Sequence, residues 1–353
     1  MDFIKIEGYK SIRKLHLELK PINILIGANG AGKSNFISFF SFLKTAYDQQ
    51  LQNFVAKKGG VDKFLYNGRK QTEHIFAHLK FGDYFYEFKL GYGDTNFLVE
   101  DERSGRGNRF DFESWGVLVN ELQVKTNTRE LSPYIYRYLD GLKVYHFHET
   151  GEKSPFNTDC SIGDNFVLQS NGANLAAFLY KLQQNDRIVY NRIIKVIQSV
   201  APYFLDFDLR PNTEGSEYIR LAWRDIYSEN RYGAVDFSDG TIRFIALVAL
   251  FLQPNPPAVI IIDEPELGLH PFALNKLAGL IQSMASRNTQ VIFSTQSVEL
   301  VNCFEPEDII TVDNKGESFF NRLNKEQLSE WLDNYAVGDL WKQNLLNKGF
   351  PNK

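Results

Sequence analysis

The sequence predicts an α/β protein in which buried strands alternate with helices, and three segments support this fold class. An apolar run at 22–26 ends in a glycine and precedes a helical pattern with phenylalanines on one face. A second apolar run at 258–263 leads through a helical segment at 271–284 to another buried strand at 290–295. The chain between 72 and 147 instead shows the aromatic alternation of antiparallel strands. We therefore expect alternating buried strands and helices at both ends of the chain and a strand-rich segment between 72 and 147.

The composition excludes several classes of protein. The chain has 353 residues, of which 43% are hydrophobic and 23% charged, and this balance is typical of a folded chain. The longest apolar run, residues 244–252, is about half as long as a membrane-spanning helix requires. Two cysteines, Cys160 and Cys303, are too few for a disulfide framework, and residues 1–10 lack the apolar stretch of a signal peptide. We expect a soluble cytoplasmic protein that does not contact a membrane.

A phosphate-binding motif connects the first buried strand to its helix. The segment GANGAGKS at 27–34 matches G-x-x-x-x-G-K-[ST] and has the required strand before it and helix after it. Its glycines let backbone N–H groups point at phosphate oxygens, and the helix N-terminus adds positive charge. Lys33 should reach the β- and γ-phosphates, and Ser34 should place its hydroxyl on Mg²⁺. The residues assigned to the bound nucleoside triphosphate are Asn29, Gly30, Ala31, Gly32, Lys33, Ser34 and Asn35.

A pair of carboxylates follows the apolar strand at 258–263. The carboxyl end of such a strand is where open α/β sheets bind their ligands. Asp263 would hold Mg²⁺ partly through water, and Glu264 would orient or deprotonate the attacking water. The alternative is a structural acid pair at a helix N-terminus beside Pro265. The phosphate loop elsewhere in the chain favours the catalytic interpretation.

A third motif lies between these two. In FSDGTIRFIALVALFL at 237–252, a Ser-x-Gly turn opens an apolar helix before the acidic pair. This order of motifs resembles the ABC-type ATPases of the RecF and SMC kind. The resemblance extends to a group of predicted bacterial RecF-like AAA ATPases, through motifs spread over most of the chain. These motifs are YKSI at 9–12, NILIGANGAGKSN at 23–35, DEPELGLHP at 263–271, FSTQS at 293–297 and WLDNYAVGDLW at 331–341.

The resemblance implies a P-loop NTPase fold of the ABC-type ATPase head, with a mixed sheet core, an antiparallel β lobe and an inserted helical lobe that carries the signature. It also implies that the chain binds ATP and Mg²⁺. Two heads would sandwich two ATP molecules as a C2-symmetric homodimer. The lobes would be 1–60 with the first strands and the P-loop helix, 61–170 rich in β-strands, 171–257 helical with the signature motif, and 258–353 with the acidic motif and the C-terminal strands and helix. Ser238, Asp239 and Gly240 would contact the γ-phosphate held by the opposing subunit. Glu266, Leu267, Gly268 and His270 would form the loop at the dimer interface.

An ordinary N-cap is the alternative for Ser238 or Asp239, and capping is compatible with a phosphate contact. Gln296 stands where related families carry a histidine that contacts the γ-phosphate. An amide still donates and accepts hydrogen bonds, so we expect a catalytic γ-phosphate sensor without pH sensitivity. His148 is our suggestion for the position of the families' glutamine loop.

Two functions follow from the resemblance. The first is an ATPase that couples hydrolysis to DNA maintenance or to bacterial anti-phage defence. The alternative is a slow ATP-gated scaffold that controls a separate effector, such as a nuclease or toxin, without binding DNA. The net charge of −4 gives no basic footprint, although Lys181, Arg187, Arg192 and Lys195 form a local basic segment for DNA or simply a solvated face. Too few residues follow Asp263 for a fused nuclease, and the lack of heptads excludes a long-armed SMC protein.

Overall fold

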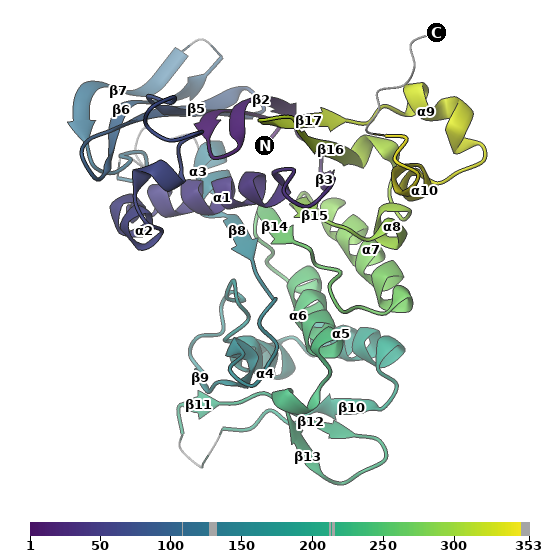
Figure 1. Cartoon of the computed structure of the whole chain (residues 1–353). Helices are drawn as coiled ribbons and strands as arrows, with labels where there is room; N and C mark the ends of the chain where they lie inside the picture. Colours follow the sequence, from purple (N-terminus) through teal and green to yellow (C-terminus); the bar gives the residue numbers. More distant parts are fainter. Residues whose placement is uncertain (108, 127–132, 212, 214–215, 347–353) are drawn as a thin grey trace. The chain divides into compact units, whose positions relative to one another are not determined.

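The structure is a computed structural model that describes residues 1–107, 109–126, 133–211, 213 and 216–346 (Figure 1). The chain forms two compact units, and each is built from separate stretches of sequence. The first unit comprises Met1–Val144, Pro257–Ile261 and Gln290–Lys353. The second unit comprises Tyr145–Pro256 and Ile262–Thr289. Among the described residues, no helix is both long enough and apolar enough to cross a membrane.

The first unit contains an antiparallel sheet of six strands in the order β2-β1-β4-β5-β6-β7. Its strands are β1 (Phe3–Tyr9), β2 (Ile12–Glu18), β4 (Ile75–Phe81), β5 (Tyr84–Tyr92), β6 (Phe97–Arg106) and β7 (Arg109–Val119). Ile4 and Ile6 of β1 are buried while their neighbours are half-exposed, which is the alternation expected of a sheet with one face on the core. An antiparallel sheet is therefore present, and it includes β1 and β2 from the start of the chain as well as strands from the segment at 61–170.

A second six-stranded sheet of the first unit has the order β17-β16-β3-β15-β14-β8. Its strands are β3 (Ile22–Ile26), β8 (Leu142–Tyr145), β14 (Val259–Asp263), β15 (Gln290–Ser294), β16 (Ile309–Asn314) and β17 (Ser318–Arg322). The central strand β3 pairs in parallel with β15 and β16, whereas β16 pairs antiparallel with β17. The core sheet is therefore mixed, as the family resemblance implies.

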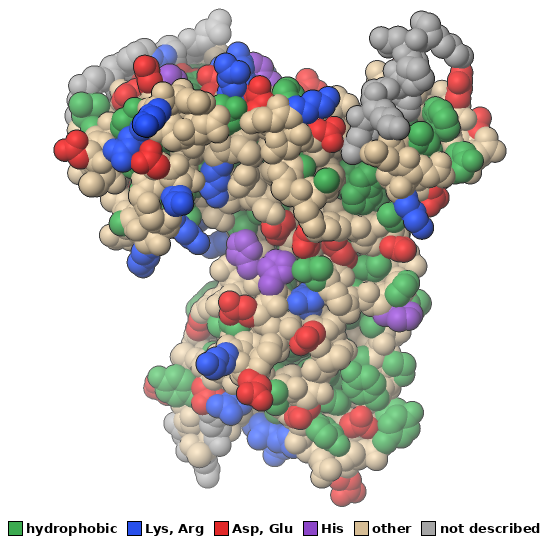
Figure 2. Space-filling model, viewed as in Figure 1, with side chains coloured by type: hydrophobic (Ala, Val, Ile, Leu, Met, Phe, Trp, Pro, Cys, Tyr) green, Lys and Arg blue, Asp and Glu red, His purple; other side chains and the backbone are tan. Residues whose placement is uncertain are grey.

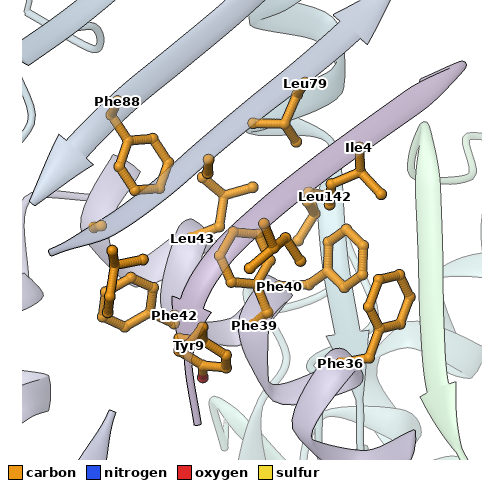
Figure 3. Close-up of a cluster of buried hydrophobic side chains, with 14 of the residues drawn as sticks. Ile4, Tyr9, Phe36, Phe39, Phe40, Phe42, Leu43, Leu79, Phe88 and Leu142 are labelled. Atoms are coloured by element: carbon orange, nitrogen blue, oxygen red, sulfur yellow. The ribbon is translucent and has the colours of Figure 1, made fainter. Parts of the chain in front are cut away.

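Helix α1 (Lys33–Tyr47) is largely buried in the first unit, and its N-terminus directly follows the phosphate loop. Its aromatic side chains pack with Ile4 and Tyr9 of β1, Leu79 of β4, Phe88 of β5 and Leu142 of β8 (Figure 3). A helix that is apolar on most sides needs such cover. The ring centroids of Tyr9 and Phe39 lie 5.2 Å apart, edge to face, which is a favourable aromatic arrangement. The remaining helices of this unit are α2 (Leu51–Lys57), α3 (Pro133–Asp140), α8 (Val298–Val301), α9 (Lys325–Leu332) and α10 (Val337–Lys342).

The second unit is built around helix α6 (Asp239–Leu252), whose residues from Ile242 onward are all buried. Three further helices belong to this unit, namely α4 (Leu175–Asn185), α5 (Arg187–Val200) and α7 (Pro271–Ala285). Its short strands are β9 (Cys160–Ser161), β10 (Phe204–Phe207), β11 (Tyr218–Ile219), β12 (Ala222–Asp225) and β13 (Arg231–Gly233). They form the small sheets β10-β12-β13 and β11-β9. The apolar helix predicted after the Ser-x-Gly turn is thus the core of this unit.

Candidate nucleotide-binding site

The segment between β3 and α1 has the backbone conformation of a tight loop. Gly27, Gly30 and Gly32 all have positive φ, at 149°, 79° and 116°. A Cβ on Gly27 would overlap the carbonyl oxygen of Val312, and a Cβ on Gly32 would overlap the hydroxyl of Ser318. Both positions therefore require glycine for space as well as for backbone conformation. The spacing of glycines in the sequence is explained by these two close approaches.

Lys33 begins α1 and folds its side chain back over the loop. It is only 5% exposed, and its ammonium donates hydrogen bonds to the carbonyl oxygens of Gly27 at 2.7 Å and Ala28 at 3.1 Å. Carbonyl groups offset only part of the cost of burying an ammonium ion, and a phosphate anion would offset more. The side chain is thus already held at the loop to which phosphate would bind.

The outer surface of the loop is open to solvent. Ala28, Asn29, Gly30 and Ser34 are exposed, and Asn35 is half-exposed. Ser34 lies in the first turn of α1, where helix N–H groups have no acceptor within the helix. The predicted binding residues thus alternate between exposed positions at both ends of the loop and the buried segment Ala31–Lys33 between them.

A chain of hydrogen bonds that the sequence did not predict supports the loop from β17. The Asn35 amide donates to the Ser11 hydroxyl at 2.8 Å, and the Ser11 and Ser318 hydroxyls lie 2.7 Å apart. Ser318 also lies 2.7 Å from the carbonyl oxygen of Ala31, which can only accept. The hydroxyl hydrogen of Ser318 therefore goes to Ala31, and Ser11 donates to Ser318. The only sequence signal for this support was the YKSI motif, which contains Ser11.

Asp263 is the last residue of β14, the strand next to β15 in the core sheet, and Glu264 follows it directly. The sheet order places β14, which ends at Asp263, two strands from β3 and its phosphate loop. Both carboxylates are half-exposed. Glu264 has a φ of 46°, a left-handed conformation that costs an L-residue roughly 1–2 kcal/mol. Such strain often marks a functional position, and here the backbone changes direction directly after Asp263.

The two residues predicted to hold Mg²⁺, Ser34 and Asp263, both carry oxygen atoms of the kind that this ion prefers. The hydroxyl of Ser34 and the carboxylate of Asp263 are hard donors, and Mg²⁺ usually completes its shell with water and phosphate oxygens. No group of three or more His, Cys, Asp or Glu side chains that could hold a metal ion occurs among the described residues.

Gln296 is exposed in the turn that follows β15. Thr295 donates its backbone N–H to the Leu25 carbonyl at 3.0 Å, which holds the turn beside the strand that enters the phosphate loop. The Ser297 hydroxyl caps α8 by accepting from Leu300 N–H at 3.1 Å. Both sides of the turn are thus fixed, while the Gln296 side chain remains at the surface.

The signature turn lies in the second unit. The Ser238 hydroxyl caps α6 by accepting from Thr241 N–H at 3.2 Å, so the N-cap alternative is realised. Ser238 and Asp239 are both exposed, which leaves the first turn of the helix accessible. A Cβ on Gly240 would overlap the Gly268 carbonyl oxygen, so the predicted interface loop lies directly on this turn.

The rest of that loop is partly buried and partly open. Glu266 is buried, and its carbonyl accepts from Leu269 N–H at 3.0 Å. Leu267 is 38% exposed, and His270 caps α7 with its ring nitrogen 3.3 Å from Phe272 N–H. The phosphate loop and Gln296 belong to the first unit, whereas the signature turn and this loop belong to the second.

Comparison with known proteins identifies a family for this chain. A family model described as "AAA domain, putative AbiEii toxin, Type IV TA system" matches residues 22–302. A search among curated proteins found no match.

Among solved structures, an SMC head bound to the C-winged helix domain of ScpA matches with a TM-score of 0.62 and 13% identity, over 93% of this chain and 99% of that one. An SMC head with an extended coiled coil, bound to the C-terminal domain of ScpA from Pyrococcus furiosus, matches with a TM-score of 0.56 and 14% identity, over 94% and 98%. The predicted fold, a P-loop ABC-type ATPase head, is confirmed.

Proposed function

Because the chain belongs to the AAA family described as a putative AbiEii toxin of type IV toxin–antitoxin systems, we propose that it is a Mg²⁺-dependent ATPase that dimerises head to head around ATP. The observation that carries this proposal is the preformed phosphate loop. Its glycines have the required conformation, and the Lys33 ammonium is already folded onto the loop. A loop with this geometry binds the phosphates of a nucleotide through backbone N–H groups.

The side chains around the loop have distinct roles in the proposed reaction. Lys33 would bind the β- and γ-phosphates, and Ser34 and Asp263 are the side chains that would hold the metal ion. Mg²⁺, when bound, offsets negative charge on the phosphates. Glu264 accepts a proton from the attacking water, and Gln296 orients that water or the γ-phosphate by hydrogen bonding.

The proposed dimer contact uses the open surface of the second unit. Ser238 and Asp239 are exposed at the N-terminus of α6, where backbone N–H groups favour an anion such as a γ-phosphate. Leu267, in the loop that contacts this turn, and Phe272, at the start of α7, leave 38% and 47% of their surfaces exposed. Apolar side chains next to an anion-binding helix end are suited to contact with a second copy of this chain. Closure on ATP would be reversed by hydrolysis, because the γ-phosphate is the shared ligand.

The proposed biological role is in DNA maintenance or anti-phage defence. The toxin–antitoxin description of the family supports a role in defence. Direct DNA binding has weaker support. Arg187, Arg192 and Lys195 are exposed on α5, but Lys and Arg side chains are interspersed with Asp and Glu on the face drawn in Figure 2. The phosphate backbone of DNA binds to surfaces on which Lys and Arg side chains are continuous, and this face lacks that pattern.

A second candidate is a slowly hydrolysing regulator of a separate effector protein. Two observations favour it. Gln296 is neutral where related families use histidine, and the two matching SMC heads are described as bound to a domain of another protein, ScpA. Stimulation of hydrolysis by DNA would favour the first role, whereas a co-purifying nuclease or toxin would favour the second.

The direct test of the nucleotide site is calorimetric ATP titration with Mg²⁺ present. Lys33→Ala should abolish measurable binding, because it removes the charged hydrogen-bond donor at the β- and γ-phosphates. Lys44→Ala is the matched control, since Lys44 lies on the same helix but pairs with Asp48 at 3.1 Å. Unchanged ATP affinity in folded Lys33→Ala would refute the assignment of the loop.

A further inference from the structure

Arg243 is a buried arginine in the apolar helix that follows the signature turn. It is 7% exposed and lies one turn after Ser238–Gly240 on α6. Its guanidinium forms no ion pair with a carboxylate among the described residues; instead it donates to three backbone carbonyls. Nε reaches the oxygen of Phe147 at 2.9 Å, Nη2 reaches that of His148 at 3.3 Å, and Nη1 reaches that of Leu267.

These bonds connect three segments that are distant in the sequence. Phe147 and His148 follow β8, Leu267 belongs to the 266–270 loop, and Arg243 lies on α6. The loop is in close contact with the helix, because a Cβ on Gly268 would lie only 3.1 Å from Nη1 of Arg243. Gly268 also has a φ of 75°, a backbone conformation that favours glycine. The contact between Gly240 and the Gly268 carbonyl adds a second point of attachment. The signature turn and the interface loop are thus joined within one unit.

Packing alone does not account for an arginine at this position. The surrounding residues of α6 are apolar and buried, and a leucine or methionine would fill the position without desolvating a charge. Burial lowers the pKa of the Arg243 guanidinium, which reflects that cost. The planar guanidinium group provides three nitrogen donors in fixed directions, and they reach carbonyl oxygens on two other segments. The geometry therefore favours a role in holding those segments in place.

We propose that Arg243 is a positioning residue that holds the 266–270 loop on the signature turn, so that both surfaces meet a second copy of the chain together. This inference rests on the proposed ATP-dependent dimer. The three hydrogen bonds of Arg243 all go to residues of the second unit, whereas the phosphate loop at 27–34 belongs to the first. It should therefore govern dimerisation and leave ATP binding by the monomer unchanged.

The test compares Arg243→Met and Arg243→Lys in the Glu264→Gln background of the full chain. In Mg²⁺–ATP, Arg243→Met should weaken the dimer at least about tenfold by sedimentation, the scale of lost hydrogen bonds to a charged group. ATP affinity by calorimetry should stay within about twofold, as expected for separate sites. Arg243→Lys keeps the positive charge but lacks the planar guanidinium group. Its dimer affinity should lie between those of Arg243→Met and the Glu264→Gln chain.

Tyr190→Phe is the matched control for a merely structural effect. It removes a hydrogen bond of 2.6 Å to Asp206 within the second unit and leaves Arg243 untouched. Tyr190→Phe should lower the melting temperature but preserve the dimer. If it weakens the dimer as much as Arg243→Met at equal stability, or if both Arg243 variants dimerise normally, the inference is overturned.

Hydrogen exchange of the monomer separates this inference from the proposed function. Arg243→Met, or Arg243→Lys if the methionine variant does not fold, should speed exchange at residues 266–270 without ATP. If the Glu264→Gln chain fails to dimerise on ATP, the proposed dimer is refuted. The rate of hydrogen exchange at residues 266–270 still measures whether Arg243 restrains that loop. Unchanged exchange in that loop would refute the role of Arg243 whatever the Glu264→Gln chain does.

Discussion

Removing the Ser318 hydroxyl is a sharp test of how the phosphate loop is held. Ser318 is buried at the start of β17, and its hydroxyl lies 2.7 Å from both the Ala31 carbonyl and the Ser11 hydroxyl. Ser318→Ala removes both contacts and leaves a loop carbonyl without this donor. The backbone bond from Ser318 N–H to the Ser11 carbonyl, at 2.8 Å, does not involve the side chain and should hold the strand in place.

The size of the effect follows from the bonds that are lost. A neutral hydrogen bond contributes about 0.5–1.5 kcal/mol, and an unsatisfied buried acceptor costs about 1–3 kcal/mol. We expect the binding-competent loop to lose about 1–2 kcal/mol relative to other conformations. Because apparent affinity falls with the population of the competent state, the Kd for ATP should rise about 5- to 30-fold.

The assay is calorimetric ATP titration of Ser318→Ala in the presence of Mg²⁺. Ser329→Ala is the matched control, since its exposed hydroxyl donates to the Glu326 carbonyl at 2.9 Å on α9, away from the loop. The control should bind ATP as the unsubstituted chain does. Wild-type affinity in folded Ser318→Ala would show that the hydroxyl chain does not support the binding conformation, and the reasoning would fail.

Two further predictions concern single carboxylates. Glu264→Gln should bind ATP normally and lose hydrolysis by about 10²-fold or more, the scale of general-base catalysis, in a phosphate-release assay; normal turnover would move the base role away from Glu264. Burial raises the pKa of Glu102, so the folded chain binds that proton more tightly than the unfolded chain does. The stability of the wild type relative to Glu102→Gln should therefore increase as the pH falls from 7 towards the ordinary glutamate pKa. Denaturant unfolding of both chains at several pH values measures the difference in their free energies of unfolding. If that difference does not change with pH, the pKa of Glu102 is not raised in the folded chain.

Sequence patterns predicted the parts of the fold that depend on local chemistry. The glycine spacing of 27–34 and the apolar run before it give the phosphate loop, since both reflect backbone conformation and burial along a short stretch. The Ser318–Ser11 contact joins residues 307 apart and depends on how β16 and β17 pair beside β3. No pattern within one segment encodes such a contact.

Two features of the second unit were also outside the reach of local patterns. Its strands β9 to β13 span two to four residues each, which is too short for alternation to be read. Arg243 lies in a segment that looks simply apolar, and its partners are carbonyl oxygens, which every residue carries. The role of such a side chain becomes visible only when the three segments are brought together.

The central claim, that two copies share ATP through the signature turn, is tested most directly by the mass of the particle in solution. Light scattering should find Glu264→Gln at about twice its 40.6 kDa monomer mass with Mg²⁺–ATP and at the monomer mass without it. Adding Ser238→Arg places a long, charged side chain at the proposed contact, so the double variant should stay monomeric while binding ATP almost normally. A double variant that still dimerises on ATP, or one that no longer binds ATP at all, would contradict a site shared between two copies.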